Sequence, residues 1–326
     1  MSENLLEVRD LVKHFPVQQG VLASRLSKKV RAVDGVSFNI KKGETLGLVG
    51  ESGSGKSTAG RAIMRLLEPT SGSVRFEDID VLALKGKNLK EFRRKVQIIF
   101  QDPYASLNPR MTIAEIITEP LKIHRIGTSR EQIKQAKDLL DVVGLNPEHI
   151  NRYPHEFSGG QRQRIGIARA LALTPDLLVC DEPIAALDVS IQAQIIALLK
   201  SLCREHGTAI MLVTHDMGVI AETADRVAVM YAGRIVEIGP VADVIHHPRH
   251  PYTAGLMGSI PSVTDERERL EQIDGSMPRL NAIPPGCAFN PRCPKVQPRC
   301  TLERPDLFEA GSSQAACWLH APGASQ

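Results

Sequence analysis

The chain has 326 residues, a formal net charge of +3, 24% charged residues and 42% hydrophobic residues. These values indicate a globular protein with room for one large α/β domain and an appendage. The small net charge and the 4% of aromatic residues argue against nucleic acid as a partner. No apolar run approaches the ~18 residues of a membrane span. Because residues 1–4 also lack the blocks of a signal peptide, we expect a cytoplasmic protein.

Short strands dominate the first fifty residues. Residues 5–9 and 30–49 read as strands and turns, and residues 45–49 form an apolar run typical of a buried parallel strand. A glycine-rich segment, GESGSGKS, follows at residues 50–57, and a helix is expected from Ser57 to about Leu67. This order of strand, loop and helix is the context that a phosphate-binding loop requires.

The glycine-rich segment has the residue types that hold a nucleoside triphosphate. Glycines let the backbone approach the phosphates, and the N–H groups at the start of the helix attract anions. Lys56 is expected to bridge the β- and γ-phosphates, and the hydroxyl of Ser57 is expected to ligate Mg²⁺. The predicted ATP-binding residues of this loop are Gly50, Glu51, Ser52, Gly53, Ser54, Gly55, Lys56, Ser57 and Thr58.

A helical insertion is expected after the next strand, residues 96–100. Gln101 ends that strand, where its side chain can reach Mg²⁺ and the attacking water. Residues 111–150 show helical periodicity, and a further helix begins after Ser158. Ser158 as N-cap, with two glycines after it, predicts a second phosphate-binding surface, which would serve the nucleotide of another subunit. Its residues are Ser158, Gly159, Gly160 and Gln161.

Acidic residues end the strand of residues 177–180. Asp181 is placed to hold Mg²⁺, and Glu182 is placed to activate the attacking water as a general base. A helix at residues 190–205 and strands at 209–213 and 226–230 complete a mainly parallel sheet wrapped by helices. His215 follows one of these strands and is expected to contact the γ-phosphate.

The composition changes after about residue 240, where prolines become too frequent for regular elements. Four cysteines crowd together as Cys287, Cys293, Cys300 and Cys317, whereas Cys180 and Cys203 are expected in the core. Disulfides are not expected in a reducing compartment, so the four thiols predict a metal centre. Zinc and an iron–sulfur cluster both remain open, although the C-x2–4-C knuckle usual for zinc is absent.

Taken together, these motifs resemble the ATP-binding subunit of an ABC transporter over residues 1 to about 240. The resemblance implies a P-loop NTPase (RecA-like) α/β fold: a parallel sheet, an antiparallel β subdomain and a helical subdomain at about residues 102–165. It implies ATP and Mg²⁺ as cofactors, with Mg²⁺ on Ser57, Gln101 and Asp181. It also implies that Phe15 stacks on adenine and that Asp188 lies in the loop facing the opposite subunit. The family usually has Ser where this chain has Ala185.

The rest of the chain is similar to the oligopeptide and dipeptide importer branch of that family, especially to the second ATPase subunit of dipeptide importers. The similarity rests on residues 102–110, on the inserted residues 18–29, and on a C-terminal extension at residues 241–326. It implies a [4Fe-4S] cluster on the four late cysteines, with zinc as the alternative.

By this resemblance the chain hydrolyses ATP to drive uptake of di- or oligopeptides, or of nickel, glutathione or another small solute. The implied partners are a second, non-identical ATPase subunit, two membrane permease subunits and a periplasmic substrate-binding protein. The implied location is the cytoplasmic face of the inner membrane. A soluble ABC ATPase, a P-loop kinase and an exporter subunit are the rival interpretations; the first usually carries two such domains or a long coiled coil.

Overall fold

A computed structural model describes residues 3–16, 29–184, 189–259 and 273–323. The chain divides into two compact units. The first unit contains residues 1–40, 45–82 and 214–326, and the second contains residues 41–44 and 83–213. The predicted boundary near residue 240 therefore falls inside the first unit, at the end of one of its strands.

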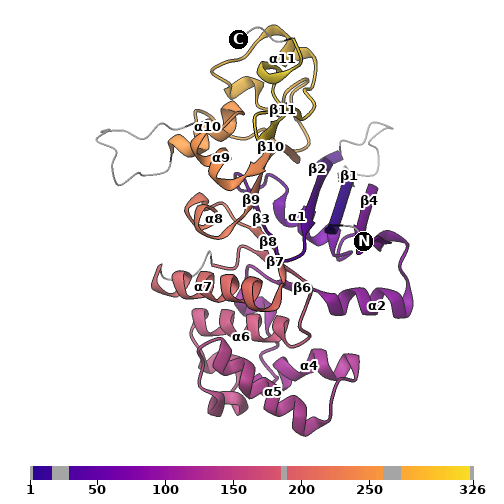
Figure 1. Cartoon of the computed structure of the whole chain (residues 1–326), viewed down its shortest axis with the longest axis vertical. Helices are drawn as coiled ribbons and strands as arrows, with labels where there is room; N and C mark the ends of the chain where they lie inside the picture. The colour runs from indigo at the N-terminus through magenta and orange to yellow at the C-terminus, as the bar shows by residue number, and fades with distance from the viewer. Residues whose placement is uncertain (1–2, 17–28, 185–188, 260–272, 324–326) are drawn as a thin grey trace, which may run out of the picture. The chain divides into compact units, whose positions relative to one another are not determined.

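The first unit contains an antiparallel sheet in the order β2-β1-β4-β5 (Figure 1). Its strands are β1 (Asn4–Pro16), β2 (Lys29–Lys41), β4 (Ser71–Phe76) and β5 (Ile79–Asp80). Leu6 and Val8 of β1 are buried and face Phe76 and Val74 of β4, as the two-residue period of a strand predicts. This sheet is the antiparallel β subdomain expected from the sequence.

The same unit holds the strand that leads into the glycine-rich loop. Strand β3 (Thr45–Val49) is buried along its whole length and pairs in parallel with β9 (Arg226–Tyr231). Helix α1 (Lys56–Ile63) follows the loop and ends before the predicted Leu67. Strand β10 (Arg234–Pro240) runs antiparallel to β9, and helices α8 (Met217–Thr223) and α9 (Val241–His246) flank these strands in sequence.

The prediction that the proline-rich extension lacks regular elements was wrong. It contains helices α10 (Pro251–Gly258) and α11 (Pro298–Leu302), and strands β11 (Phe308–Ala310) and β12 (Ser313–Ala315). Both helices start on a proline, where the missing N–H has no intrahelical partner to lose. Strand β12 pairs with β10 through Glu237 and Ala315, so the extension continues the sheet of the first unit.

An aromatic cluster ties the extension to the end of β9. Tyr231, Tyr252 and Phe289 are at most 1% exposed, and their ring centroids lie 4.6 to 5.4 Å apart. The fully buried carboxylate of Glu237 accepts the backbone N–H groups of Arg249 and His250, each at 2.8 Å. The start of α10 is thereby fixed to β10, which places Tyr252 in the cluster.

The second unit combines a parallel set of strands with a group of helices. Strands β6 (Val96–Ile99), β7 (Leu177–Asp181) and β8 (Ala209–Val213) pair in the order β8-β7-β6. Figure 1 shows α4, α5 and α6 side by side, as their mutual contacts require. The helices of the unit are α2 (Gly86–Lys95), α3 (Pro103–Ser106), α4 (Ile113–His124), α5 (Ser129–Val142), α6 (Gly159–Leu171) and α7 (Val189–His206).

Local signals in the sequence explain where these helices begin. Thr112 and Thr128 cap α4 and α5, and in each case a glutamate three residues later bonds back to the capping residue. Ser158 caps α6 in the same way, as the sequence predicts. Throughout the described parts of the chain, no helix combines the length and the apolar character needed to cross a membrane.

Candidate nucleotide-binding site

The glycine-rich loop of the first unit follows a path that only glycine can take at two points. Gly50 has φ 148° and Gly55 has φ 106°. A Cβ atom on Gly50 would lie 2.1 Å from the carbonyl oxygen of Met230, and one on Gly55 would lie 2.0 Å from that of Ala32. The loop is therefore pressed against its neighbouring backbone at both points, and a side chain at either glycine would force the backbone to move.

Lys56 points its ammonium group back into this loop. The side chain is buried, and Nζ donates to the carbonyl oxygens of Gly50 at 2.7 Å and Glu51 at 2.9 Å. Ser57 and Thr58 lie in the first turn of α1, directly after Lys56. A buried cation beside a helix N-terminus is a strong site for phosphate groups. The predicted phosphate-binding residues thus lie in the glycine-rich loop and in the first turn of α1 that follows it.

Two residues of the C-terminal extension contact this loop, and the sequence did not predict these contacts. The backbone N–H of Glu51 donates to the hydroxyl of Tyr252 at 3.0 Å. The carboxylate of Glu51 accepts from Nη1 of Arg292 at 2.8 Å. No motif signals either pairing, although Arg292 directly precedes Cys293, one of the four late cysteines.

Phe15, the predicted adenine partner, lies near the end of β1 and is partly exposed, with Nζ of Lys13 5.0 Å from its ring centroid. Its neighbour His14 bonds through Nε2 to Asp34 at 3.0 Å. Asp34 also accepts from Arg234 at 3.0 Å and Arg304 at 3.2 Å. Burial opposes ionisation of Asp34, but Arg234 and His14 outweigh it and hold the pKa of that carboxyl below its usual range.

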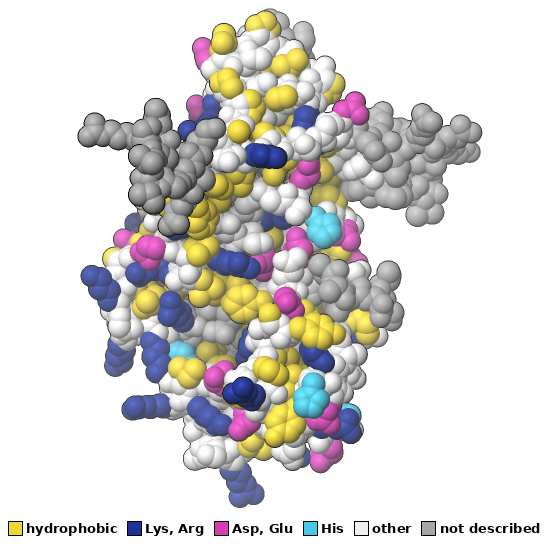
Figure 2. Space-filling model, turned by 180° about the vertical axis from the view of Figure 1, so that it is seen from behind, with side chains coloured by type: hydrophobic (Ala, Val, Ile, Leu, Met, Phe, Trp, Pro, Cys, Tyr) yellow, Lys and Arg dark blue, Asp and Glu magenta, His cyan; other side chains and the backbone are white. Residues whose placement is uncertain are grey.

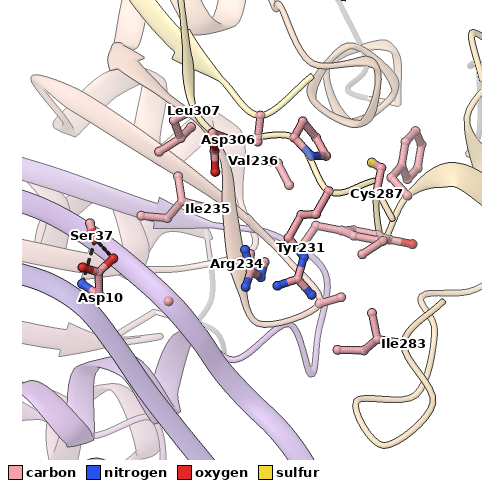
Figure 3. Close-up of a pocket in the computed structure, with 17 residues that line it drawn as sticks. Asp10, Ser37, Tyr231, Arg234, Ile235, Val236, Ile283, Cys287, Asp306 and Leu307 are labelled. Atoms are coloured by element: carbon pink, nitrogen blue, oxygen red, sulfur yellow. Dashed lines mark hydrogen bonds between the residues drawn. The ribbon is translucent and has the colours of Figure 1, made fainter. Parts of the chain in front are cut away.

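A cavity of about 280 Å³ opens between β1, β2, β10 and the extension of the first unit (Figure 3). Asp10 and Ser37 line one side, and Arg234, Tyr231 and Cys287 line the other. Proline, aliphatic and charged side chains together line this cavity. None of the residues predicted to bind ATP is among them. It is therefore separate from the glycine-rich loop.

The acidic groups predicted to act in hydrolysis lie in the second unit. Asp181 ends β7 and is 2% exposed, and Glu182 follows with φ 47°. The N–H of Glu182 donates to the carbonyl of Val213 at 2.9 Å, which fixes this strained turn. Nε2 of Gln101 donates to Oε2 of Glu182 at 2.7 Å. The structure thus joins two of the three predicted catalytic residues.

The predicted second phosphate-binding surface starts α6. The N–H of Gln161 donates to Oγ of Ser158 at 3.3 Å, and Oε1 of Gln161 accepts the N–H of Ser158 at 3.0 Å. Tyr104 was not predicted, yet its ring lies 4.2 Å from Cζ of Arg162 and its hydroxyl would be 3.6 Å from a Cβ on Gly159. The segment after Gln101 therefore packs beside the first turn of α6.

The remaining residues singled out in the sequence lie in different places. His215 follows β8 and is exposed, in the first unit. Asp188 and Ala185 lie outside the described residues. Cys180 is fully buried, as expected, but Cys203 is only partly buried, and its thiol donates to the carbonyl of Gly43 at 2.9 Å.

The four late cysteines line one small cavity of about 10 Å³ in the extension. Burial raises the pKa of Cys287 to about 11, and the charges of the other cysteines add to the effect. Burial likewise raises the pKa of Cys293 and of Cys317. Within the described residues, no group of three or more His, Cys, Asp or Glu side chains is arranged so that it could hold a metal ion.

Comparison with known proteins identifies the family. Residues 33–185 match the family described as "ABC transporter", and residues 236–300 match "Oligopeptide/dipeptide transporter, C-terminal region". The chain is 47% identical to the oligopeptide transport ATP-binding protein AppF of Bacillus subtilis, with 98% of each chain covered. It is 48% identical to a probable peptide ABC transporter ATP-binding protein, y4tS, of Sinorhizobium fredii, covering 100% of this chain and 92% of that one. The chain belongs to the ABC transporter ATP-binding proteins, in the oligopeptide/dipeptide branch.

Solved structures of ABC ATPases have a similar fold. A dimeric ATP-binding cassette, MJ0796, in a post-hydrolysis state with ADP and Pi, has a TM-score of 0.65 and 32% identity, and the match covers 72% of this chain and 98% of that chain. The protein cbiO1 of Clostridium perfringens, part of an ABC transporter complex, has a TM-score of 0.63 at 28% identity, covering 76% and 92%. This ABC protein is an ATPase with the P-loop fold predicted from its sequence, and ATP with Mg²⁺ is the nucleotide that such a fold takes.

Removing the amide that contacts Glu182 should slow hydrolysis by this ABC ATPase. We expect Gln101→Ala to lower kcat about tenfold, because the carboxylate loses the donor that orients it, and to leave the affinity for ATP measured without Mg²⁺ unchanged. The control is Gln97→Ala in β6, whose amide donates to the carbonyl of Arg93. Steady-state ATPase kinetics measure kcat in both variants. An equal loss of kcat in both would show that Gln101 has no special role.

Proposed function

We propose that this chain is the ATP-hydrolysing subunit of an ABC importer that takes up di- and oligopeptides. One observation carries the proposal: identity of 47 to 48% to proteins named as peptide transport ATP-binding proteins runs through both the ATPase residues and the extension. The proposed site of action is the cytoplasmic face of the cell membrane. The proposed partners are a related but non-identical ATPase subunit, two membrane permeases and an extracytoplasmic substrate-binding protein.

The proposed roles in hydrolysis follow from the chemistry of each residue. Lys56 and the N–H groups of the glycine-rich loop bind the β- and γ-phosphates, and Phe15 stacks on the adenine. Glu182 accepts the proton of the attacking water, and Gln101 orients its carboxylate through the 2.7 Å contact. Bound Mg²⁺, on Ser57, Gln101 and Asp181, would neutralise charge on the phosphates. His215 contacts the γ-phosphate.

We propose that Ser158, Gly159, Gly160 and Gln161 bind the ATP held by the partner ATPase. Ser158 and Gln161 form two hydrogen bonds with each other, which fix the first turn of α6. Because the two glycines have no side chains, they leave room for phosphate. Closure of the two ATPases on ATP is then favoured because only the closed pair gives each nucleotide both surfaces. Hydrolysis removes the γ-phosphate that joins them and permits reopening.

The segment after Gln101 is the proposed connection to the permeases. Arg169 of α6 donates to the carbonyl of Ser106 at 2.7 Å, and Tyr104 stacks against Arg162. A shift of α6 must therefore move this segment. Large apolar side chains are exposed in the same unit, with Tyr104 at 60% and Ile123 at 54%. Figure 2 shows hydrophobic side chains among charged ones over the helices of this unit, in the lower part of the view.

We further propose that Cys287, Cys293, Cys300 and Cys317 hold a [4Fe-4S] cluster, with zinc as the alternative. The donor set fits a metal centre in kind, because the four thiols line one cavity and only a cation would compensate four thiolates placed together. A bound cluster would brace the extension by cross-linking the short segments that carry these four cysteines. In the described residues the thiols are not gathered to metal-binding positions.

Replacing the proposed general base tests the transport function. In vesicles with the two permeases, the partner ATPase and the binding protein, we expect Glu182→Gln to abolish ATP-driven peptide uptake. ATP binding should persist, because only the water-activating carboxylate is lost. Hydrolysis should fall by ~10² or more. Peptide uptake at the wild-type rate in the Glu182→Gln variant would refute the assignment, as would wild-type ATPase that is never coupled to peptide uptake.

Metal analysis tests the cysteine centre. Protein purified without oxygen should contain iron and acid-labile sulfide, and replacing Cys293 and Cys317 with Ser should remove both, because thiolates are the ligands of such clusters. The control is Cys203→Ser, a cysteine of the second unit, which should keep the wild-type iron content. Zinc in place of iron would establish the alternative, and a metal content unchanged by the double variant would contradict both.

A further inference from the structure

One residue of the glycine-rich loop is held by two side chains of the C-terminal extension. Arg292 Nη1 donates to Glu51 Oε1 at 2.8 Å, and the Glu51 N–H donates to the hydroxyl of Tyr252 at 3.0 Å. The carbonyl of the same Glu51 accepts from Nζ of Lys56 at 2.9 Å. Glu51 therefore joins the extension to the ammonium group that the phosphates of ATP meet.

Arg292 is a rigid anchor. Its side chain is 7% exposed, compared with 29% for Glu51. Nε donates to the carbonyl of Asp274 at 2.9 Å, and Nη2 donates to that of Gly275 at 3.3 Å. Because a planar guanidinium held at several of its corners has little freedom, the position of Glu51 is set by Arg292 rather than the reverse.

Tyr252 is anchored equally well. The residue is fully buried, and its ring lies 4.6 Å from that of Tyr231 and 5.4 Å from that of Phe289. Burial raises the pKa of the Tyr252 hydroxyl, so it stays protonated and neutral. Figure 3 shows Tyr231, at the end of β9, beside the segment of the extension that carries Cys287. The hydroxyl that accepts the Glu51 N–H is thus held by the aromatic cluster.

The ion pair also has an electrostatic consequence. A carboxylate in a loop that binds a polyphosphate repels the ligand unless a cation neutralises it. Arg292 supplies that cation and draws the carboxylate toward the extension. Met277 of the same region approaches the loop too, with its Cε 3.6 Å from where a Cβ on Gly53 would lie.

We propose that Arg292 and Tyr252 are positioning residues for ATP binding. They hold the backbone and the charge of Glu51 so that the loop keeps the shape in which Lys56 receives the phosphates. The extension, which the family match associates with the oligopeptide/dipeptide branch, thereby sets the ATP affinity of the catalytic unit. The inference rests on the assignment of the glycine-rich loop as the ATP site.

The test compares KM for ATP with kcat in the full-length protein, together with equilibrium binding of ADP. Arg292→Met should raise KM and the Kd for ADP about tenfold and change kcat by less than about twofold, because a charge-assisted contact that shapes binding is lost. Arg292→Lys, which keeps the charge, should lie between. Tyr252→Phe removes one hydroxyl and should raise KM about threefold.

The control is Arg299→Met. Arg299 also directly precedes a cysteine of the extension, but it is 55% exposed and pairs with Glu303. We expect its KM to equal that of the wild type. A further variant tests the route: adding Glu51→Gln to Arg292→Met should lower KM again, because the unpaired carboxylate is removed.

Three outcomes would overturn the inference: an unchanged KM in Arg292→Met, an equal rise in Arg299→Met, or no recovery on adding Glu51→Gln. The first of these, if a lower melting temperature and a lower kcat accompany it, would show that Arg292 has a purely structural role. Lys56→Ala separates the two claims. If Lys56→Ala binds ADP and ATP normally, the assignment of the loop is wrong; if Lys56→Ala loses affinity while Arg292→Met does not, only the role of Arg292 is wrong.

Discussion

The site depends on a buried positive charge. An ammonium group taken out of water is costly unless its hydrogen bonds are replaced. Lys56 recovers them from the carbonyls of Gly50 and Glu51, inside a loop that glycine alone can form at residues 50 and 55. A triphosphate can take over these contacts with full negative charges, so the loop favours ATP without having to be rebuilt. The neighbours that hold the loop in shape therefore matter as much as the residues that touch the phosphates.

Those neighbours come from separate parts of the first unit. Strand β9 supplies the backbone against which Gly50 is pressed, β2 supplies the backbone against which Gly55 is pressed, and the extension supplies Arg292 and Tyr252. In the second unit, one short segment after β6 carries Gln101 at one end and contacts α6 at the other. Gln101 and the helix proposed to face a partner's ATP are thus joined through this segment. An ATPase that must transmit work needs such a connection.

The sequence predicts local features well. Strand β3 has the predicted bounds because a buried parallel strand is a short apolar run between turn residues, and α6 begins at its predicted cap because Ser158 and Gln161 satisfy each other locally. The extension was misjudged because proline was taken to exclude helices, whereas Pro251 and Pro298 start them. Tyr252 and Arg292 could not be predicted, since they lie 201 and 241 residues from Glu51 and only tertiary packing joins them.

The central claim is that one copy of this chain supplies only half of each working ATP site, the glycine-rich loop for one nucleotide and Ser158 to Gln161 for another. The most direct test is the ATPase rate per chain measured against protein concentration, from well below to well above the range of dimer formation. The account predicts a rate per chain that rises with concentration, levels off when pairs are complete, and rises further when the partner ATPase is added. A full rate that is constant down to concentrations at which only monomer is present would contradict it.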